Sequence, residues 1–266
     1  MFKSFLHFLK SISKCIATLN YLKEASTTLS YLYTLAERSR SQYSRQSFRI
    51  AILINVKRTL YFLSIYLRVK NLFVERFSIR SVIEGYTQGY FLMSEGDGEP
   101  IEWYYTNERT LIPLDDRFRY PKSLQRVINQ NRFEVRIDTV FDQVVTGCAD
   151  RETTWISKEL RSLYNNLHEA GWAHSFETWQ GDELAGAILG IAVRGIFIGE
   201  SMFFKIPESS KVAMVKLVEH LRSRGYSLFD AQLMNPHLAR FGAYEIGDQN
   251  YQELLKKALA KSCSFN

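Results

Sequence analysis

The chain has 266 residues, of which 46% are hydrophobic and 23% charged, so it can bury a core as one large domain or two small ones. This composition excludes disordered, collagen-like and disulfide-stapled proteins. The formal net charge of +6 indicates an affinity for nucleic acid or an anionic membrane, provided that the charge lies where a partner can reach it.

The positive charge is confined to the first 80 residues. Residues 1–80 contain 14 Lys or Arg against three Glu, a net charge of +11, which leaves the rest of the chain at −5. They also contain no Gly, Pro, Asp or Trp, although average usage predicts about ten Gly plus Pro. One interpretation is a basic amphipathic helix on a membrane. The compositional break favours the other, an extension without folding partners or sequence upstream of the true start.

Cysteine usage indicates the compartment. Cys15, Cys148 and Cys263 lie far apart, without a C-x-x-C pair, which predicts a reducing, cytoplasmic environment. The N-terminal apolar stretch is too interrupted for a secretion signal, and no apolar run approaches the roughly 20 residues of a spanning helix.

Turn-forming residues typical of a globular domain begin after residue 80, where glycines and prolines first appear. The first half of this body predicts two strands, a helix opened by Pro121, a strand and a helix, over residues 101–105, 110–114, 121–131, 133–138 and from 139 onward.

The second half has clearer periodicity. Apolar residues at helical spacing predict a helix over 155–170, opened by Trp155 and stopped by Gly171. A three-strand meander, a helix capped by Ser209 or Ser210, a strand and a last helix are predicted over residues 174–179, 184–193, 196–203, 209–221, 226–233 and 250–260. This order predicts an α+β fold with a mixed sheet.

The polar pair Asp230 and Gln232 interrupts the otherwise apolar strand 226–233. On a strand these two side chains lie on the same face, about 7 Å apart. Such groups are costly there unless they have partners or face a cleft. Two interpretations remain open on the residues alone: the solvated face of an edge strand, or a functional pair.

A further carboxylate, Glu200, stands near the end of an apolar strand in Gly-Glu-Ser-Met-Phe. A carboxylate in a cleft suits recognition of a guanidinium through two parallel hydrogen bonds. Ser201 lacks the G-x-S-x-G setting of a hydrolase nucleophile. Zinc is not indicated either, because metal-ligand spacing is absent from His168, His174 and His237.

Aromatic and basic residues offer a nucleic-acid interpretation. Trp155 and the aromatic block at 103–105 can stack a nucleobase, with core packing as the alternative for each. The densest basic run of the acidic body is either a solvated face or a phosphate footprint, and consists of Arg117, Arg119, Lys122 and Arg126. Glycine-rich phosphate loops do not occur.

Taken in order, several fragments resemble the leucyl/phenylalanyl-tRNA–protein transferase family. They are Gly85-Tyr86 with Gln88-Gly89, Trp103-Tyr104, residues 141–149, Thr154-Trp155-Ile156, HEAGWAHSFETW at 168–179, GESMF at 199–203, Asp230-Ala231-Gln232 and residues 235–246. The succession of HEAGWAHSFETW, GESMF and D-x-Q is far more specific than any one of them.

The resemblance implies that leucine or phenylalanine moves from aminoacyl-tRNA to the α-amine of proteins with N-terminal Arg or Lys, marking them for degradation. It implies a GNAT-like acyltransferase domain over 109–266, after a remnant of a small N-terminal domain at 81–108 and the basic extension at 1–80. Since an aminoacyl ester is already activated, no metal or other cofactor is expected. We expect a monomer, with membrane contact only if the extension is real.

Site residues carry over by position. The resemblance implies that Asp230 and Gln232 orient and deprotonate the attacking amine, and that Glu200 contacts the acceptor. Trp155 is implied to pack on the terminal adenosine of the tRNA, with Met93 where many members have a second tryptophan, and the basic run above to contact the tRNA backbone. The pocket for the aminoacyl side chain is implied to consist of Ile188, Phe197, Met214, Leu217, Leu221 and Phe229.

Two features depart from the family: an early segment with a Gly-Gly-Asp-Leu turn is missing, and Pro-Arg does not follow Ile246. One alternative function is an acetyl-CoA-dependent N-acetyltransferase, but residues 205–210 lack the glycines of its pyrophosphate loop. Another is a tRNA-binding or membrane-binding protein that keeps the fold without transferase activity, against which the intact Asp230, Gln232 and Glu200 argue.

Overall fold

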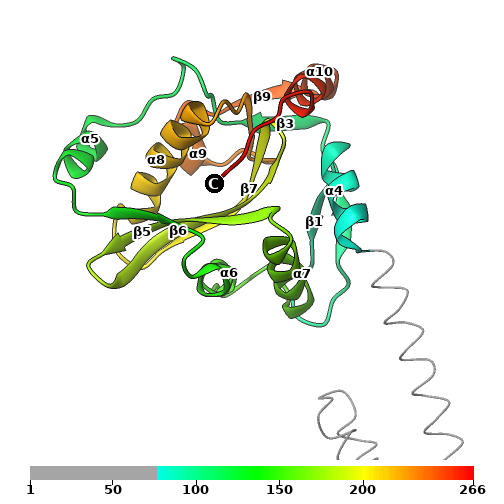
Figure 1. Cartoon of the computed structure of the whole chain (residues 1–266), viewed down its shortest axis with the longest axis horizontal. Helices are drawn as coiled ribbons and strands as arrows, with labels where there is room; N and C mark the ends of the chain where they lie inside the picture. Colours follow the sequence, from blue (N-terminus) through cyan, green and yellow to red (C-terminus); the bar gives the residue numbers. More distant parts are fainter. Residues whose placement is uncertain (1–76) are drawn as a thin grey trace, which may run out of the picture. The chain divides into compact units, whose positions relative to one another are not determined.

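The computed structural model describes residues 77–266, drawn in colour in Figure 1. Residues 1–76, to which most of the predictions for the basic extension apply, lie outside the described residues. Regular structure begins inside the predicted extension, because helix α4 (Ile79–Thr87) starts at Ile79. The Ser78 side chain caps this helix by accepting the Ser81 backbone N–H at 3.2 Å, satisfying a donor that the first turn leaves free.

A small two-stranded sheet follows α4. Strands β1 (Phe91–Met93) and β2 (Glu102–Tyr104) pair antiparallel, with Leu92 opposite Trp103. Gly85 is needed where α4 crosses this hairpin, since a Cβ there would collide with the Trp103 ring.

The main sheet has seven strands in the order β4-β5-β6-β7-β8-β3-β9. Every neighbouring pair is antiparallel except β7 and β8, which run parallel. The predicted mixed sheet of an α+β fold is thus confirmed. The strands are β3 (Glu108–Leu111), β4 (Glu134–Ile137), β5 (Ala173–Gln180), β6 (Glu183–Val193), β7 (Ile196–Phe204), β8 (Leu228–Asp230) and β9 (Tyr244–Gly247).

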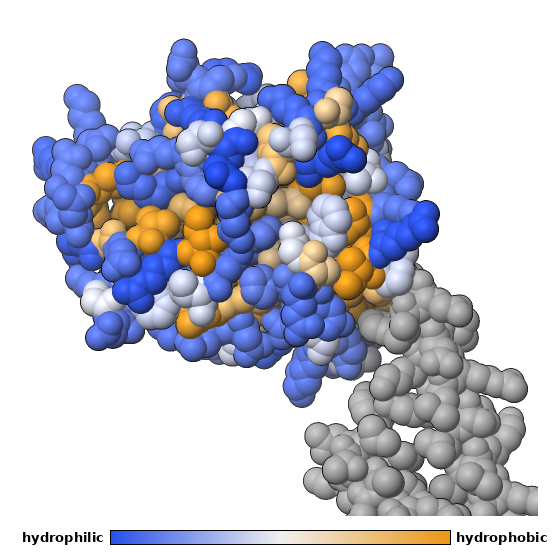
Figure 2. Space-filling view, viewed as in Figure 1, coloured by the Kyte–Doolittle hydropathy of each residue, from blue (hydrophilic) through white to orange (hydrophobic). Residues whose placement is uncertain are grey.

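Helices cover both faces of the sheet (Figure 1). Helix α8 lies across β5, β6 and β7 on one face, and α6 and α7 lie against the other. The face in Figure 2 shows hydrophobic residues in its middle, bordered by hydrophilic residues. The remaining helices are α5 (Lys122–Asn129), α6 (Phe141–Ala149), α7 (Lys158–Glu169), α8 (Ser209–Ser223), α9 (Pro236–Ala239) and α10 (Asp248–Leu259). Across residues 77–266, we find no helix with the length and apolarity needed to cross a membrane.

Three local predictions are wrong. Trp155 does not open a helix, because α7 starts at Lys158 after the cap residue Ser157, whose side chain accepts the Leu160 N–H. Neither Ser209 nor Ser210 caps α8, since Glu208 is the cap residue and Ser209 Oγ bonds to Ala185 O instead, at 2.7 Å.

The third error concerns the strand that carries the polar pair. Strand β8 ends at Asp230, and Gln232 adopts a left-handed backbone with φ of 55°. The two side chains therefore do not share one strand face. An edge strand is also excluded, because β8 lies between β7 and β3.

Candidate functional site

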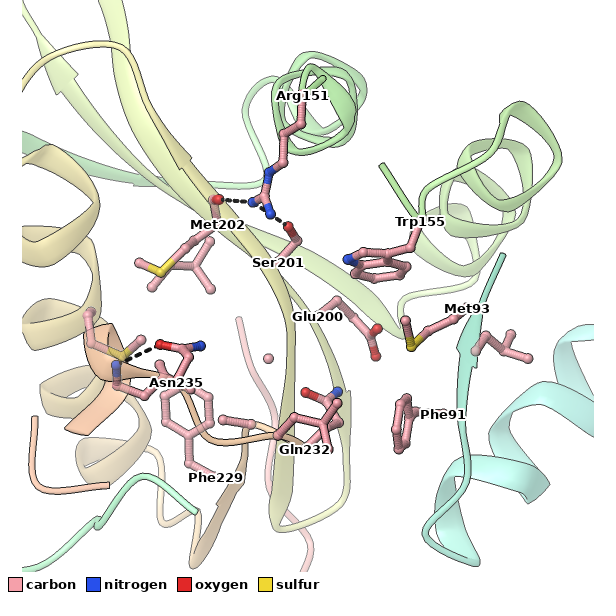
Figure 3. Close-up of a pocket in the computed structure, with 17 residues that line it drawn as sticks. Phe91, Met93, Arg151, Trp155, Glu200, Ser201, Met202, Phe229, Gln232 and Asn235 are labelled. Atoms are coloured by element: carbon pink, nitrogen blue, oxygen red, sulfur yellow. Dashed lines mark hydrogen bonds between the residues drawn. The ribbon is translucent and has the colours of Figure 1, made fainter. Parts of the chain in front are cut away.

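A cavity of about 270 Å³ opens where the middle of β7 and the end of β8 face β1 (Figure 3). Its wall has a polar middle between two apolar parts. Trp155, Met93 and Phe91 surround the Glu200 carboxylate on one side. Gln232 stands beside Glu200, while Met202, Phe229 and Asn235 lie towards the other end.

Half of the predicted side-chain pocket lines this cavity. Ile188, Met214 and Phe229 are in its wall, where Met202 and Leu238 join them. The other three residues of the predicted pocket are not in that wall and lie in the buried core, so a role for them in binding stays a prediction; they are Phe197, Leu217 and Leu221.

Gly199 allows the Phe229 ring to approach the strand. A Cβ on Gly199 would lie only 2.9 Å from Phe229 Cε2, closer than carbon atoms pack without displacement. The glycine therefore sets the depth of this apolar end.

Asp230 does not line the cavity, and its carboxylate is hydrogen-bonded within the protein. Its Oδ1 accepts the Gln232 backbone N–H at 2.9 Å, and its Oδ2 accepts Tyr251 Oη at 2.7 Å. The side chain is 2% exposed. Burial raises the pKa of Asp230, while the charge of Arg109 and these hydrogen bonds oppose that effect. The carboxylate consequently holds its neighbours in place more than it offers an atom to a ligand.

The cation beside Asp230 is Arg109 of β3. Its Nε lies 3.7 Å from Asp230 Oδ2, and the residue is only 1% exposed. The guanidinium lies 4.4 Å from the centroid of the Tyr251 ring and donates through Nη2 to Gly89 O. A buried charge needs such a partner, since an unpaired one costs several kcal/mol, on the order of 3–5.

Gln232 completes the wall next to Glu200. In the amide orientation that satisfies hydrogen bonding, its nitrogen donates to Ala231 O and to Gly199 O, both at 2.9 Å. Because the two N–H groups are used in this way, the remaining capacity of the side chain is that of an acceptor.

The Glu200 carboxylate has one engaged oxygen and one without a partner. Oε2 accepts Tyr164 Oη at 2.8 Å, whereas Oε1 is buried without a hydrogen bond. Burial raises the pKa of Glu200 to about 7. The Tyr164 hydroxyl lowers this pKa through its hydrogen bond, and the nearby Tyr86 hydroxyl, which forms no hydrogen bond in this structure, lowers it too; the charge of Asp230 raises it and that of Arg109 lowers it. This group can therefore bind or release a proton near neutral pH.

Trp155 is held against the small N-terminal sheet by its own backbone. Its carbonyl accepts the Ser94 N–H at 3.1 Å, one residue after β1. Met93 belongs to that strand and lines the same part of the cavity. The structure thus brings the two residues predicted to contact adenosine to one end of the cavity.

The predicted basic run lies away from this cavity, around α5 and the segment before it. Arg119, Lys122 and Arg126 are exposed. Arg117 is exposed too, but it pairs with Asp115, with Nη2 2.7 Å from Oδ2. Its charge is partly neutralised by that contact.

The histidines have structural neighbours. His174 Nδ1 lies 2.7 Å from Asp138 Oδ2, and His168 stacks on Phe141 with ring centroids 4.0 Å apart. Within residues 77–266, side chains of the kinds that ligate metals form no cluster able to hold an ion.

Sequence reasoning missed five residues that build the site. Arg109 and Tyr251 support Asp230, Tyr164 and Tyr86 face Glu200, and Arg151 at the cavity rim donates to Met202 O at 2.6 Å. One signal was present: Tyr164 follows Leu160 by four residues and so lies on the buried face of α7. Arg109 resembles an ordinary surface charge in the sequence.

Comparisons with known proteins agree on one family. The model of the leucyl/phenylalanyl-tRNA protein transferase matches residues 111–256, and the model of its N-terminal domain matches residues 75–107. A transferase of that name from Gloeothece citriformis is 67% identical over 183 residues, which are 69% of this chain and 95% of the relative. One from Nostoc punctiforme is 62% identical over 190 residues, 71% of this chain and 99% of the relative.

One solved structure aligns with part of the chain. It is the C-terminal domain of a putative lysylphosphatidylglycerol synthetase from Agrobacterium fabrum, which aligns with 57% of this chain and 51% of its own at a TM-score of 0.36 and 13% identity. So low a score leaves the GNAT-like assignment a prediction.

Proposed function

The chain belongs to the leucyl/phenylalanyl-tRNA–protein transferase family, and on that premise we propose that it moves leucine or phenylalanine from tRNA to the α-amine of proteins beginning with Arg or Lys. The product carries a new peptide bond that marks it for degradation. One observation supports this assignment most directly: an apolar pocket opens beside Glu200 and Gln232 within one cavity. An apolar pocket leaves a charged aminoacyl group unpaired.

Each part of the cavity has a role in this reaction. The aminoacyl side chain enters the part lined by Ile188, Met214 and Phe229, and the terminal adenosine packs on Trp155 and Met93. The acceptor amine then meets the ester beside Gln232 and Glu200. Holding the two reactants together supplies much of the rate enhancement, because effective concentrations in such arrangements are very high.

The basic residues around α5 are assigned to the tRNA backbone. Arg119, Lys122 and Arg126 offer exposed charges, while Arg117 must exchange Asp115 for a phosphate. The body is net negative, so tRNA binding through these residues should weaken with salt in proportion to the few phosphates contacted.

Further parts of the proposal concern organisation. The catalytic domain spans 109–266 with a GNAT-like fold, after a small N-terminal domain, and the enzyme acts as a cytoplasmic monomer without a metal or other cofactor. The activated ester supports this last point, since its alcohol is a sufficient leaving group once the amine is neutral.

The decisive experiment measures transfer of radiolabelled leucine from Leu-tRNA to a peptide with N-terminal Arg. The same peptide beginning with Ala is the matched control, and Phe-tRNA is the second donor. We expect labelling of the Arg peptide alone. If folded protein that binds tRNA labels neither peptide, it is a tRNA-binding protein without transferase activity. Label transferred instead from acetyl-CoA would support the acetyltransferase alternative.

A further inference from the structure

The two carboxylates of the site differ in what can reach them. Asp230 is enclosed by Gln232 N–H, Tyr251 Oη and Arg109, and it does not line the cavity. Glu200 lines the cavity and has one oxygen without a partner. We propose that Glu200, and not Asp230, takes the proton from the α-ammonium of the acceptor. This inference rests on the proposed function, because it assigns a proton acceptor to that reaction.

Gln232 is a poor carrier for a proton from the cavity to Asp230. Gln232 stands between them, but its amide nitrogen is occupied by Ala231 O and Gly199 O. An amide also has no proton of ordinary acidity to pass on. Asp230 therefore acts as a positioning residue, which holds the Gln232 backbone in its left-handed conformation through the 2.9 Å bond to Oδ1.

Glu200 is held in a geometry suited to one incoming donor. Tyr164 fixes Oε2, so a bidentate grip on a guanidinium would have to displace that bond. Oε1 remains, buried without a hydrogen bond, on the carboxylate that lies between Trp155, Met93 and Phe91 (Figure 3). A buried acceptor without a partner is unfavourable, and an ammonium group arriving with the substrate satisfies it. Glu200 thus contacts the acceptor, as the sequence resemblance implies, through its α-amine.

The electrostatics of Glu200 match this role. Its pKa of about 7 lies about one pH unit below that of an ordinary α-amine, near 7.7–8.0. Proton transfer is then about tenfold unfavourable, whereas to an ordinary glutamate, with a pKa near 4.3, it is more than a thousandfold unfavourable. The groups that face Glu200 are Tyr86 from α4, Tyr164 from α7, Asp230 from β8 and Arg109 from β3.

The step balances without any other reagent. Glu200 takes one proton from the ammonium, and the neutral amine attacks the ester carbonyl while Gln232 Oε1 accepts one of its N–H groups. A C–N bond forms and the bond from the carbonyl carbon to the ribose oxygen breaks. The second amine proton goes to that oxygen, so the products are a peptide bond, a free tRNA 3′ end and one proton that Glu200 returns to water.

The test is the pH dependence of single-turnover transfer to the Arg peptide with saturating Leu-tRNA, from about pH 5.5 to about pH 8.5. For the wild type we expect the rate to fall below a midpoint near pH 7. Glu200→Gln should lower the rate by about 10²–10⁴-fold and move the acidic limb up to the pKa of the peptide's own α-amine, near 7.7–8.0, with a smaller change in KM for the peptide.

Two variants separate proton transfer from structural support. Tyr164→Phe should move the midpoint to higher pH, because it removes a hydrogen bond that lowers the pKa of Glu200 in the wild type. Asp230→Asn should slow transfer yet keep the limb, with its midpoint at lower pH because a neighbouring negative charge is lost. A peptide whose terminal amine is replaced by an aminooxy group, largely unprotonated at neutral pH, should recover much of the Glu200→Gln rate.

The outcomes are distinguishable. No transfer by the wild type overturns the proposed function. If the wild type transfers leucine, two results overturn the inference. One is a Glu200→Gln variant that raises only KM and keeps the midpoint of the acidic limb near pH 7. The other is an Asp230→Asn variant that alone moves the limb to the pKa of the peptide's α-amine.

Discussion

Glu200 should destabilise the folded protein increasingly as pH rises, and Glu200→Gln should relieve this cost. Burial raises the carboxyl pKa from 4.5 to about 7. The neutral form therefore contributes its full effect at pH below about 4.5, and the advantage is lost as pH rises through about 7. At about 1.36 kcal/mol per pH unit, the cost reaches at most about 3 kcal/mol above pH 8. Access to the cavity reduces it.

Urea unfolding of the whole chain at about pH 5.5 and about pH 8.5 measures this effect. The stability of Glu200→Gln relative to wild type should increase by about 2 kcal/mol between the two conditions, because up to about pH 7 the folded wild type keeps a proton that its unfolded chain has already released. Glu253→Gln on α10 is the control, since Glu253 is exposed and its replacement should show no such change. A constant difference between Glu200→Gln and wild type would refute the assigned burial of this carboxylate.

Three further predictions concern the surrounding wall. Trp155→Ala should weaken tRNA binding by about 1–3 kcal/mol, the usual worth of a stacked base, while KM for the peptide stays unchanged. Gly199→Ala should push the Phe229 ring, 2.9 Å from the new Cβ, into the pocket, so that kcat/KM falls more with Phe-tRNA than with Leu-tRNA. Arg109→Met should cost about 3–5 kcal/mol in urea unfolding, because it leaves the Asp230 carboxylate unpaired. Adding Asp230→Asn should restore part of that loss, and strictly additive effects would contradict the pairing.

Local sequence patterns were sufficient to predict the three-strand meander. Strands β5, β6 and β7 begin and end within one residue of their predicted limits. Their turns depend on neighbouring residues only, such as Arg194 at φ of 55° followed by a glycine. The strand at Asp230 was predicted too long, because the left-handed turn at Gln232 is stabilised by a bond to the Asp230 side chain that no periodicity reveals.

The site was predicted where the sequence itself carries unusual polar residues. Glu200 and Gln232 interrupt apolar surroundings and do line the cavity. Arg109 was missed because its burial depends on Tyr251 and Gly89, which come from distant parts of the chain. Tertiary contacts of this kind decide whether a charge is a surface group or a support for the reactive one.

The N-terminal hairpin and α4 are parts of the site, which bears on where the chain can be shortened. Tyr86 of α4 faces Glu200, and Met93 lines the cavity. The Gly89 carbonyl oxygen accepts a hydrogen bond from the Arg109 guanidinium. A chain beginning at Phe77 keeps all of these groups and should transfer leucine at the rate of the full chain. A chain beginning at Gln88 lacks α4 and exposes the Trp103 ring that packs on Gly85, so transfer should be lost and the unfolding midpoint in urea should fall. Equal activity of the two shortened chains would show that Glu200 functions without its tyrosine neighbour on α4.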